Sequence, residues 1–324
     1  MIRKPVIAVS ACLTGQKVRH NGDSAELRAL SEGWTNHLQL MPICPEIEIG
    51  MEVPRPATKL VKQNDKVRLV SQNGSMDYTN QMLEYAQIQS DYLASTGICG
   101  FIFKNDSPTC GLEKVGIHNE DYSAVANNGR GLFATVFTAF NPHIPTIEGE
   151  KLNDAEQAEH FLARIHFFHE WQNTGVGGWD AIKIMRFHNE NKLFLLSRAP
   201  QMKRALGRMI ATRFDEGTHP ETVALEYMTK AQKALNFVTK KGRIAHTMER
   251  VFGMFSSHLS KKEKQEFVEL IHGFRQGSVP RSKPMSLLSK YLAKYDLNEK
   301  TVTRFTCPVP VSYTHLTLPT TKNV

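Results

Sequence analysis

The chain has 324 residues, of which 41% are hydrophobic and 22% charged, with 21 glycines and 15 prolines. This length corresponds to about two domains of roughly 150 residues, and the ordinary globular composition excludes collagen-like, coiled-coil and low-complexity classes. The longest apolar stretches, such as 98–103 and 131–140, fall well short of the roughly 20 residues that a membrane-spanning helix needs. We therefore predict no membrane segment and, because the N-terminus carries no secretion signal, a cytoplasmic protein.

The formal net charge of +8 is distributed unevenly along the chain. Residues 1–150 carry 13 Lys and Arg against 16 Asp and Glu, whereas residues 151–324 carry 27 against 16. Clustered cations bind phosphate backbones through counterion release, so the second half is a candidate for holding a polyanion. A basic domain without such a partner has the same composition, and charge alone does not separate the two interpretations.

The first half alternates short apolar runs with helical patterns. The apolar and β-branched runs predict strands at 6–9, 38–43 and 98–103, part of a hairpin at 66–74, and helices at 77–96 and 131–140. Strands that alternate with helices are typical of a parallel sheet covered on both faces. We therefore predict the α/β class, with a Rossmann-like parallel-sheet catalytic domain.

The second half reads as helical almost throughout. A capping-box pattern at Asn153–Glu156 begins an amphipathic helix, which we expect to end in the glycine-rich run 174–178. Pro220 and a second capping box at Ser260–Glu263 mark further helix starts. The predicted organisation is a catalytic domain at 1–150, a connecting helix and glycine-rich linker at 151–178, and a basic, all-α helical domain at 179–309, a candidate for binding RNA.

The last 15 residues, 310–324, resemble the translated sequence of an adapter used in sequencing libraries. We exclude them from fold reasoning and expect the native helical domain to be cut short before them. Cys307 lies next to this junction and is therefore left out of the candidate ligands.

Three of the five cysteines follow the predicted strands. Cys12 comes after the first strand, Cys44 directly after the second, and Cys110 a few residues after the third. The carboxyl ends of parallel strands share one edge of a sheet, where ligands bind, so these three thiols can converge. An odd number of cysteines in a cytosolic chain argues against a disulfide framework. Cys99 lies inside the third predicted strand, and we interpret it as a packed core residue.

Three convergent cysteines allow more than one chemistry. A structural zinc site needs four ligands, usually in close pairs, and the sequence has no Cys-x-x-Cys pair. Three thiolates can hold three irons of a cubane cluster and leave the fourth open to a substrate. The remaining interpretation is that the three cysteines are unrelated buried or loop residues. The turn-forming residues that flank them favour a shared site instead, because they shape tight loops; these residues are Gly15, Pro45, Pro108 and Gly111.

Five short blocks stand out in the first half: Ser10-Ala-Cys-Leu13, Cys44-Pro-Glu46, Pro54-Arg-Pro56, Lys104-x-x-Ser-Pro-Thr-Cys-Gly111 and Gly129-Arg-Gly-Leu-Phe133. Together they resemble the signature blocks of the thiouracil desulfidase family, and the resemblance spans roughly residues 4–150. The helical second half resembles the YbgA-like domain that is often fused to that enzyme. Such fusions are associated with removing sulfur from 4-thiouridine in transfer RNA (tRNA).

The resemblance implies a [4Fe-4S] cluster held by Cys12, Cys44 and Cys110, and catalytic roles for Glu46 and Ser107. A soft thiocarbonyl sulfur would bind the open iron, Glu46 would take a proton from the attacking water, and Ser107 would donate a hydrogen bond or proton to the ring nitrogen. The residues alone leave open that Glu46 is a solvated or capping carboxylate and that Ser107 is a turn element.

The leading hypothesis is a desulfidase that converts 4-thiouridine in tRNA to uridine and sulfide. The alternatives are the same reaction on free thiolated pyrimidines such as thiouracil, and a non-catalytic iron-sulfur or zinc sensor that binds nucleic acid. The candidate RNA contacts lie in basic runs with helical spacing, which is also the pattern of a solvated helix surface. These candidates are Lys203, Arg204, Arg208, Lys240, Lys241 and Arg243.

Overall fold

The computed structural model describes residues 4–31, 37–119, 124–295 and 299–306. These residues form two compact units, and the division falls between residues 161 and 162, inside helix α5 (Ala155–Thr174). The adapter-like tail and Cys307 lie outside the described residues. Within the described ranges, no helix combines the length and the apolar character that a membrane crossing requires.

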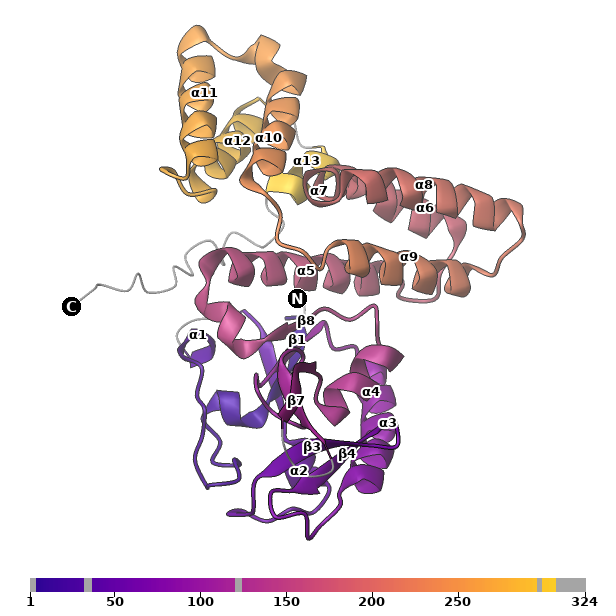
Figure 1. Ribbon diagram of the computed structural model, residues 1–324. Coiled ribbons are helices and arrows are strands. Elements are labelled where there is room, and N and C mark those ends of the chain that lie inside the picture. The colour runs from indigo at the N-terminus through magenta and orange to yellow at the C-terminus, as the bar shows by residue number, and fades with distance from the viewer. Residues whose placement is uncertain (1–3, 32–36, 120–123, 296–298, 307–324) are drawn as a thin grey trace, which may run out of the picture. The chain divides into compact units, whose positions relative to one another are not determined.

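Two four-stranded sheets form the first unit (Figure 1). Sheet A has the strand order β2-β1-β5-β8 and is parallel throughout. Sheet B has the order β4-β3-β6-β7 and combines two antiparallel pairs with one parallel pair. The strands are β1 (Val6–Ser10), β2 (Gln39–Ile43), β3 (Thr58–Gln63), β4 (Lys66–Ser71), β5 (Gly100–Phe103), β6 (Val115–His118), β7 (Ala124–Gly129) and β8 (Thr146–Glu148).

The central position of β1 in sheet A places three loops side by side. Val9 of β1 is paired with Pro42 of β2 on one side and with Ile102 of β5 on the other. Residues 7–10 are almost completely buried, which is the environment that a continuous apolar strand favours. Because all three strands run in the same direction, the loops that follow β2, β1 and β5 are neighbours at one edge of the sheet.

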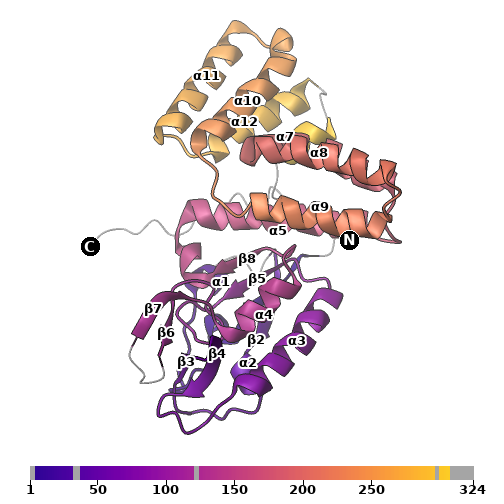
Figure 2. The ribbon, with the colours of Figure 1, turned by 45° about the vertical axis from the view of Figure 1, so that its right-hand side comes forward.

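Helices α3 (Thr79–Ser95) and α4 (Leu132–Phe140) lie next to each other in the first unit (Figures 1 and 2). An aromatic cluster joins α4 to β5, in which the rings of Phe101 and Phe103 stack at 3.8 Å and both meet Phe133 and Phe137. The remaining helical elements of this unit are short. They are η1 (Ala11–Thr14), α1 (Arg28–Ser31), α2 (Pro45–Glu48) and η3 (Gly149–Asn153).

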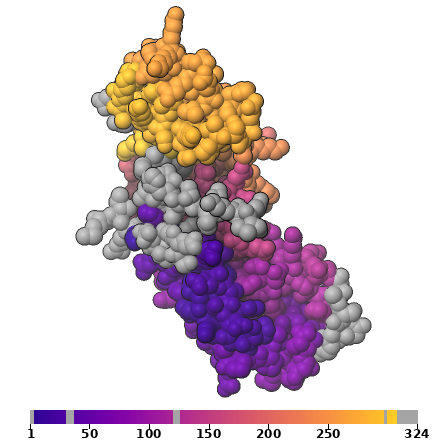
Figure 3. Space-filling view, turned by 90° about the vertical axis from the view of Figure 1, so that its left-hand side faces the viewer, coloured from indigo at the N-terminus to yellow at the C-terminus, as the bar shows by residue number. Residues whose placement is uncertain are grey.

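The described residues of the second unit are all helical or in connections between helices. Trp171 stacks on Trp179 at 3.8 Å and on Tyr227 at 4.9 Å, which gives this unit an aromatic core of its own. The side chains of α10 to α12, orange to yellow in Figure 3, form a continuous surface. The helices are α6 (Ala181–Glu190), α7 (Lys192–Arg198), α8 (Pro200–Asp215), α9 (Pro220–Ala234), α10 (Lys241–Phe255), η4 (Ser256–His258), α11 (Lys261–Gln276), α12 (Ser282–Lys294) and α13 (Lys300–Thr306).

The predicted fold class, a parallel-sheet α/β domain followed by an all-α domain, is confirmed. The expected hairpin is the antiparallel pair β3–β4. The capping box at the start of α11 is also present, since the Ser260 hydroxyl accepts from the Glu263 amide at 3.3 Å and the Glu263 carboxylate accepts from the Ser260 amide at 2.9 Å. These agreements come from strong local signals that tertiary packing does not overturn.

Two local predictions are wrong by one residue. Cys99 lies directly before β5 rather than inside it, although it is buried as expected, at 1% exposure. The N-terminal cap of α5 is Asp154 rather than Asn153, because Asn153 is still part of the short helix η3. The Asp154 carboxylate accepts from the Gln157 amide at 2.9 Å, which satisfies one of the free donors of the first turn.

Candidate active site

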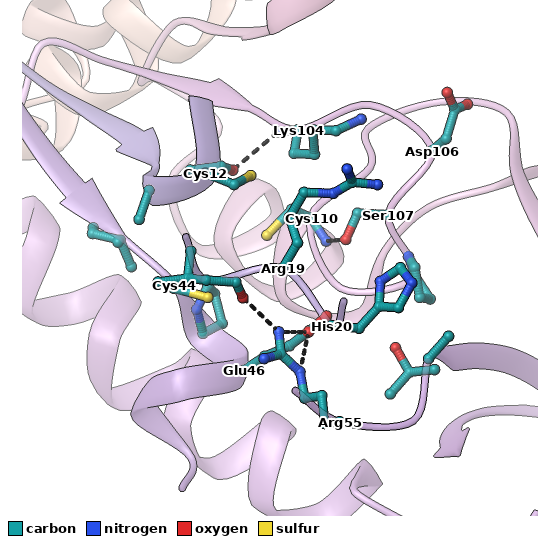
Figure 4. A pocket seen from close by; sticks show the side chains of 18 of the residues that line it. Cys12, Arg19, His20, Cys44, Glu46, Arg55, Lys104, Asp106, Ser107 and Cys110 are labelled. Carbon is teal, nitrogen blue, oxygen red and sulfur yellow. Dashed lines mark hydrogen bonds and ion pairs between the residues drawn. The ribbon is translucent and has the colours of Figure 1, made fainter. Parts of the chain in front are cut away.

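The loops after β1, β2 and β5 surround a cavity of about 420 Å³ (Figure 4). Cys12, Cys44, Glu46, Ser107 and Cys110 all line it. The structure therefore brings together every residue that the sequence suggested for the ligand and catalytic sets. The volume lies in the range of small-ligand sites, about 300–1,000 Å³.

Local backbone geometry fixes the first two cysteines. Cys12 lies in η1, and its carbonyl accepts from the amides of Gly15 at 3.4 Å and Ala25 at 2.9 Å. Gly15 has φ +88°, a conformation that an L side chain rarely adopts, so glycine allows this turn. Cys44 is the residue before α2, and Pro45 at the first helical position ends the strand and starts the helix.

The Cys110 loop is a tight turn built around Ser107. The Ser107 hydroxyl accepts from the amides of Cys110 at 3.0 Å and Thr109 at 3.3 Å, and the Gly111 amide donates to the Ser107 carbonyl at 2.8 Å. The buried hydroxyl of Ser10, at the end of β1, accepts from the Lys104 amide at 3.0 Å. This contact ties the end of β1 to the start of the loop that carries Cys110.

Burial raises the pKa of each of the three thiols. Cys110 has its pKa raised well above the ordinary value, by burial first and then by the nearby Glu46 and Cys44. Burial and then Cys44 raise the pKa of Cys12, against the opposing effect of Lys104. The pKa of Cys44 is raised mainly by burial. The thiols therefore oppose one another's ionisation, and a cationic group between them would favour the thiolates.

The donor set fits a group with several metal atoms better than a single ion. In the part of the chain that the structure describes, no three His, Cys, Asp or Glu side chains are spaced to hold one metal ion. Four described cysteines are free thiols, and three of them surround the cavity. Thiolates that bind different irons of one cluster need not share an ion, whereas a structural zinc site needs four ligands on one ion.

The Glu46 carboxylate is held by two residues to which the sequence reasoning gave no role. Arg55 donates to Oε2 through Nε at 3.0 Å and also through Nη2, and Thr109 donates to Oε1 at 2.8 Å. The Arg55 side chain is only 4% exposed. Its position between Pro54 and Pro56, in one of the family-like blocks, was the signal that could have pointed to it.

Arginine, lysine and histidine side chains also line the cavity (Figure 4). Arg19, His20 and Lys104 are among the lining residues, and within the described ranges none of them forms an ion pair with an acidic side chain. The Lys104 ammonium donates to the backbone carbonyl of Asn105 at 2.8 Å. The loop from 15 to 23 therefore adds positive charge to the cavity. A single histidine in a loop has no sequence pattern that would have identified His20.

The candidate RNA contacts lie in the second unit, on α8 and around the start of α10. Lys203 is half-buried, and burial followed by Arg250, Arg204 and Lys192 lowers its pKa. Helix α7, which begins at Lys192, contacts both α8 and α10. The structure thus groups Lys203 and Arg204 with Arg250, a further basic residue of the same runs, and with Lys192, which the sequence reasoning missed. Arg204, Arg208, Lys240 and Arg243 are exposed, and Lys241 is half-buried.

The first unit has the features of a ligand-binding or catalytic α/β domain, because its loops place thiols, a carboxylate and a hydroxyl around one cavity at a strand edge. Residues 7–149 match the 2-thiouracil desulfurase family. Residues 192–302 match DUF1722, a family of proteins of unknown function. The first half of the chain is therefore similar to the thiouracil desulfurase family and the second half to the DUF1722 family, as the resemblance in the sequence predicted.

Two curated relatives and one solved structure are similar to parts of the chain. The uncharacterized protein YbgA of Escherichia coli (strain K12) is 23% identical over 134 residues, which cover 41% of this chain and 79% of that protein. The uncharacterized protein YbbK of Bacillus subtilis (strain 168) is 26% identical over 155 residues, 46% of this chain and 99% of that protein. A solved structure described as the [4Fe-4S]-dependent thiouracil desulfidase TudS is 28% identical, with a TM-score of 0.37, and covers 48% of this chain and 98% of its own.

Proposed function

We propose that the protein is a [4Fe-4S]-dependent desulfidase that removes sulfur from 4-thiouridine in tRNA and releases uridine and sulfide. The observation that carries this proposal is the meeting of three thiols, Glu46 and Ser107 in one cavity of a thiouracil desulfurase-like domain. Cys12, Cys44 and Cys110 would hold the cluster. Free thiols fit a reducing compartment, and we expect the protein to work in the cytoplasm.

The overall reaction exchanges one atom of the base. Water supplies the oxygen of the new carbonyl, sulfur leaves as hydrogen sulfide or its anion, and no electrons are gained or lost by the base. When bound, the cluster supplies an iron without a protein ligand, a soft Lewis acid suited to a thiocarbonyl sulfur. The protein side chains then have to position the water and move its proton.

Glu46 and Ser107 suit opposite sides of that proton transfer. The Glu46 carboxylate can accept a proton from the attacking water, as a general base does. Ser107 already accepts two hydrogen bonds from backbone amides, which fills the acceptor capacity of its oxygen. Its hydroxyl hydrogen is therefore the group that it can offer to the cavity, and we assign it to donate to a ring nitrogen of the substrate.

The helical unit supplies support for an RNA substrate. Within the described ranges, Lys192, Lys203, Arg204 and Arg250 form no ion pair with an acidic side chain, so their charges are available to phosphates. A base inside folded RNA has to leave its stack to reach an enclosed site, at a cost of a few kcal/mol. A basic module that binds the rest of the RNA can offset that cost. We propose that this module extends over residues 179–309 and the catalytic domain over residues 1–150, joined by residues 151–178.

The experiment that tests the chemistry is anaerobic reconstitution of wild type, Cys110→Ala and Cys99→Ala. Iron and acid-labile sulfide are counted per chain, and sulfide release from a thiopyrimidine is assayed in parallel. We expect Cys110→Ala to lose the cluster and the activity. Cys99→Ala is the matched control, because Cys99 is equally buried but does not line the cavity. A full cluster and full turnover in Cys110→Ala would refute the ligand assignment.

A second experiment distinguishes the substrates. Sulfide release from 4-thiouridine-containing tRNA and from free 4-thiouracil is measured over a range of salt concentrations. Binding that depends on phosphate contacts weakens steeply with salt, so the tRNA reaction should fall while the free-base reaction changes little. Equal turnover of both substrates at all salt concentrations would instead favour free thiolated pyrimidines. A brown protein that releases no sulfide from either would support the sensor.

A further inference from the structure

Among the described residues, the hydrogen bonds to Glu46 leave one acceptor position of its carboxylate free. A carboxylate offers about four acceptor positions, two on each oxygen. Arg55 fills both positions on Oε2, through Nε and Nη2, and Thr109 fills one on Oε1. The remaining position is on Oε1. A proton that reaches Glu46 from a water in the cavity therefore binds at this position on Oε1.

Arg55 also binds the loop that brings Arg19 and His20 to the cavity. Its Nη2 donates to the Val18 carbonyl at 2.9 Å, and its backbone amide donates to the His20 carbonyl at 2.8 Å. Its Nη1 donates to the Glu52 carbonyl at 3.1 Å. One nearly buried guanidinium thus connects the segment after β2, the loop after β1 and the Glu46 carboxylate.

We propose that Arg55 is a positioning residue, which holds Glu46 with Oε1 as the proton-accepting oxygen and fixes the 15–23 loop beside it. The part that concerns catalysis rests on the proposed function. Lysine cannot replace arginine here, because an ammonium is a point donor that cannot reach the carboxylate and two carbonyls in one plane. Arg55 touches no reacting atom in this scheme and acts through Glu46.

The test compares Arg55→Lys and Arg55→Ala with Arg68→Ala. Arg68 is the matched control, because it also binds a carboxylate of the first unit, Asp77 at 2.9 Å, but its side chain is 39% exposed and does not line the cavity. With the cluster loaded and iron counted, we expect both Arg55 variants to lose about 100-fold in kcat, the effect of misplacing a catalytic group by about 1 Å, with little change in KM. Guanidinium ions, at concentrations far below denaturing, should restore part of the kcat of Arg55→Ala. Neither change is expected in Arg68→Ala.

A second measurement needs no activity. Amide hydrogen exchange of the peptide that covers residues 15–23 should accelerate in both Arg55 variants and stay unchanged in Arg68→Ala. Wild-type kcat with wild-type exchange in Arg55→Ala would overturn the proposal, as would a lost kcat that guanidinium does not restore. If the wild-type enzyme itself releases no sulfide, the proposed function fails, and unchanged exchange in the Arg55 variants would separately refute the role of Arg55 in the loop.

Discussion

The contact between Gly131 and the Cys110 loop gives a sharp test of how the site is assembled. Gly131 precedes α4 with φ −58° and ψ 148°, a conformation that alanine adopts freely. A Cβ at this position would lie 2.4 Å from the Thr109 carbonyl oxygen and 2.7 Å from the Cys110 nitrogen. The effect of Gly131→Ala is therefore steric, and it acts on backbone atoms that no rotamer change can move aside.

The size of the effect follows from these distances. Ordinary contact begins at 3.4 Å, so the loop has to retreat by about 1 Å. The same junction is held by the Gly131 amide, which donates to the Gly111 carbonyl at 2.7 Å, and by the Leu132 amide, which donates to the Pro108 carbonyl at 3.0 Å. Overpacking of this kind costs about 1–3 kcal/mol. For a unit of this size, each kcal/mol lowers the melting temperature by about 2–4 °C.

Calorimetric melting and iron counting after reconstitution measure the two consequences of Gly131→Ala. We expect a lower melting temperature of the first unit and fewer irons per chain, because Cys110 moves with the loop. Gly116→Ala is the control, since the nearest atom to its Cβ, Asn127 Oδ1, lies at 3.4 Å. Wild-type melting and iron content in Gly131→Ala would show that the loop yields without cost and that Gly131 does not set the position of Cys110.

Two further predictions concern the helical unit. The Nδ1 of His188 lies 3.2 Å from the Tyr227 hydroxyl, and burial, followed by Lys203, lowers the pKa of His188. The folded state therefore favours the neutral imidazole. The free energy of unfolding decreases as the pH falls below 6.5, the ordinary pKa of histidine, because the unfolded chain then binds a proton that the folded chain does not. The melting temperature of the unit should therefore fall as the pH is lowered below about 6.5, and it should fall less in His188→Asn. Equal pH dependence in both proteins would contradict this account. Lys192→Gln should make the salt dependence of tRNA binding shallower by about 1 in the log–log slope, measured by fluorescence anisotropy, whereas the equally exposed Lys290→Gln should leave it unchanged. Equal slopes for the two variants would remove Lys192 from the RNA surface.

The strands that could be predicted from the sequence are those whose residues form a continuous apolar run. The run at the start of β1 is apolar at consecutive positions because both faces of the strand are buried, and such a run predicts a buried strand without knowledge of its neighbours. β7, with two asparagines and a glycine, and β8, with three residues, carry no such pattern. Their pairing depends on partners distant in sequence, so most of sheet B and the edge of sheet A were beyond prediction.

The site could be located from the sequence for the same reason. Strand direction fixes where each strand ends, and three thiols at three neighbouring ends then meet without further information. The partners of Glu46 could not be found in this way. Arg55 is nine residues away and Thr109 sixty-three, and both reach the carboxylate from irregular segments. Both stand in the family-like blocks, Arg55 between Pro54 and Pro56 and Thr109 directly before Cys110, but the motifs gave neither of them a role.

The proposed roles of Glu46 and Ser107 show that the type of a residue does not decide whether it donates or accepts a proton. Serine can donate or accept, and a turn in which its oxygen accepts two amides leaves it only the donor role toward the cavity. Glutamate can accept at either oxygen, and the Arg55 and Thr109 contacts leave one position on Oε1. In both cases the direction of proton movement is set by neighbours that have already used the other positions. A change in Arg55 or in the Ser107 turn can therefore alter the chemistry while every thiol, Glu46 and Ser107 itself remain in the sequence.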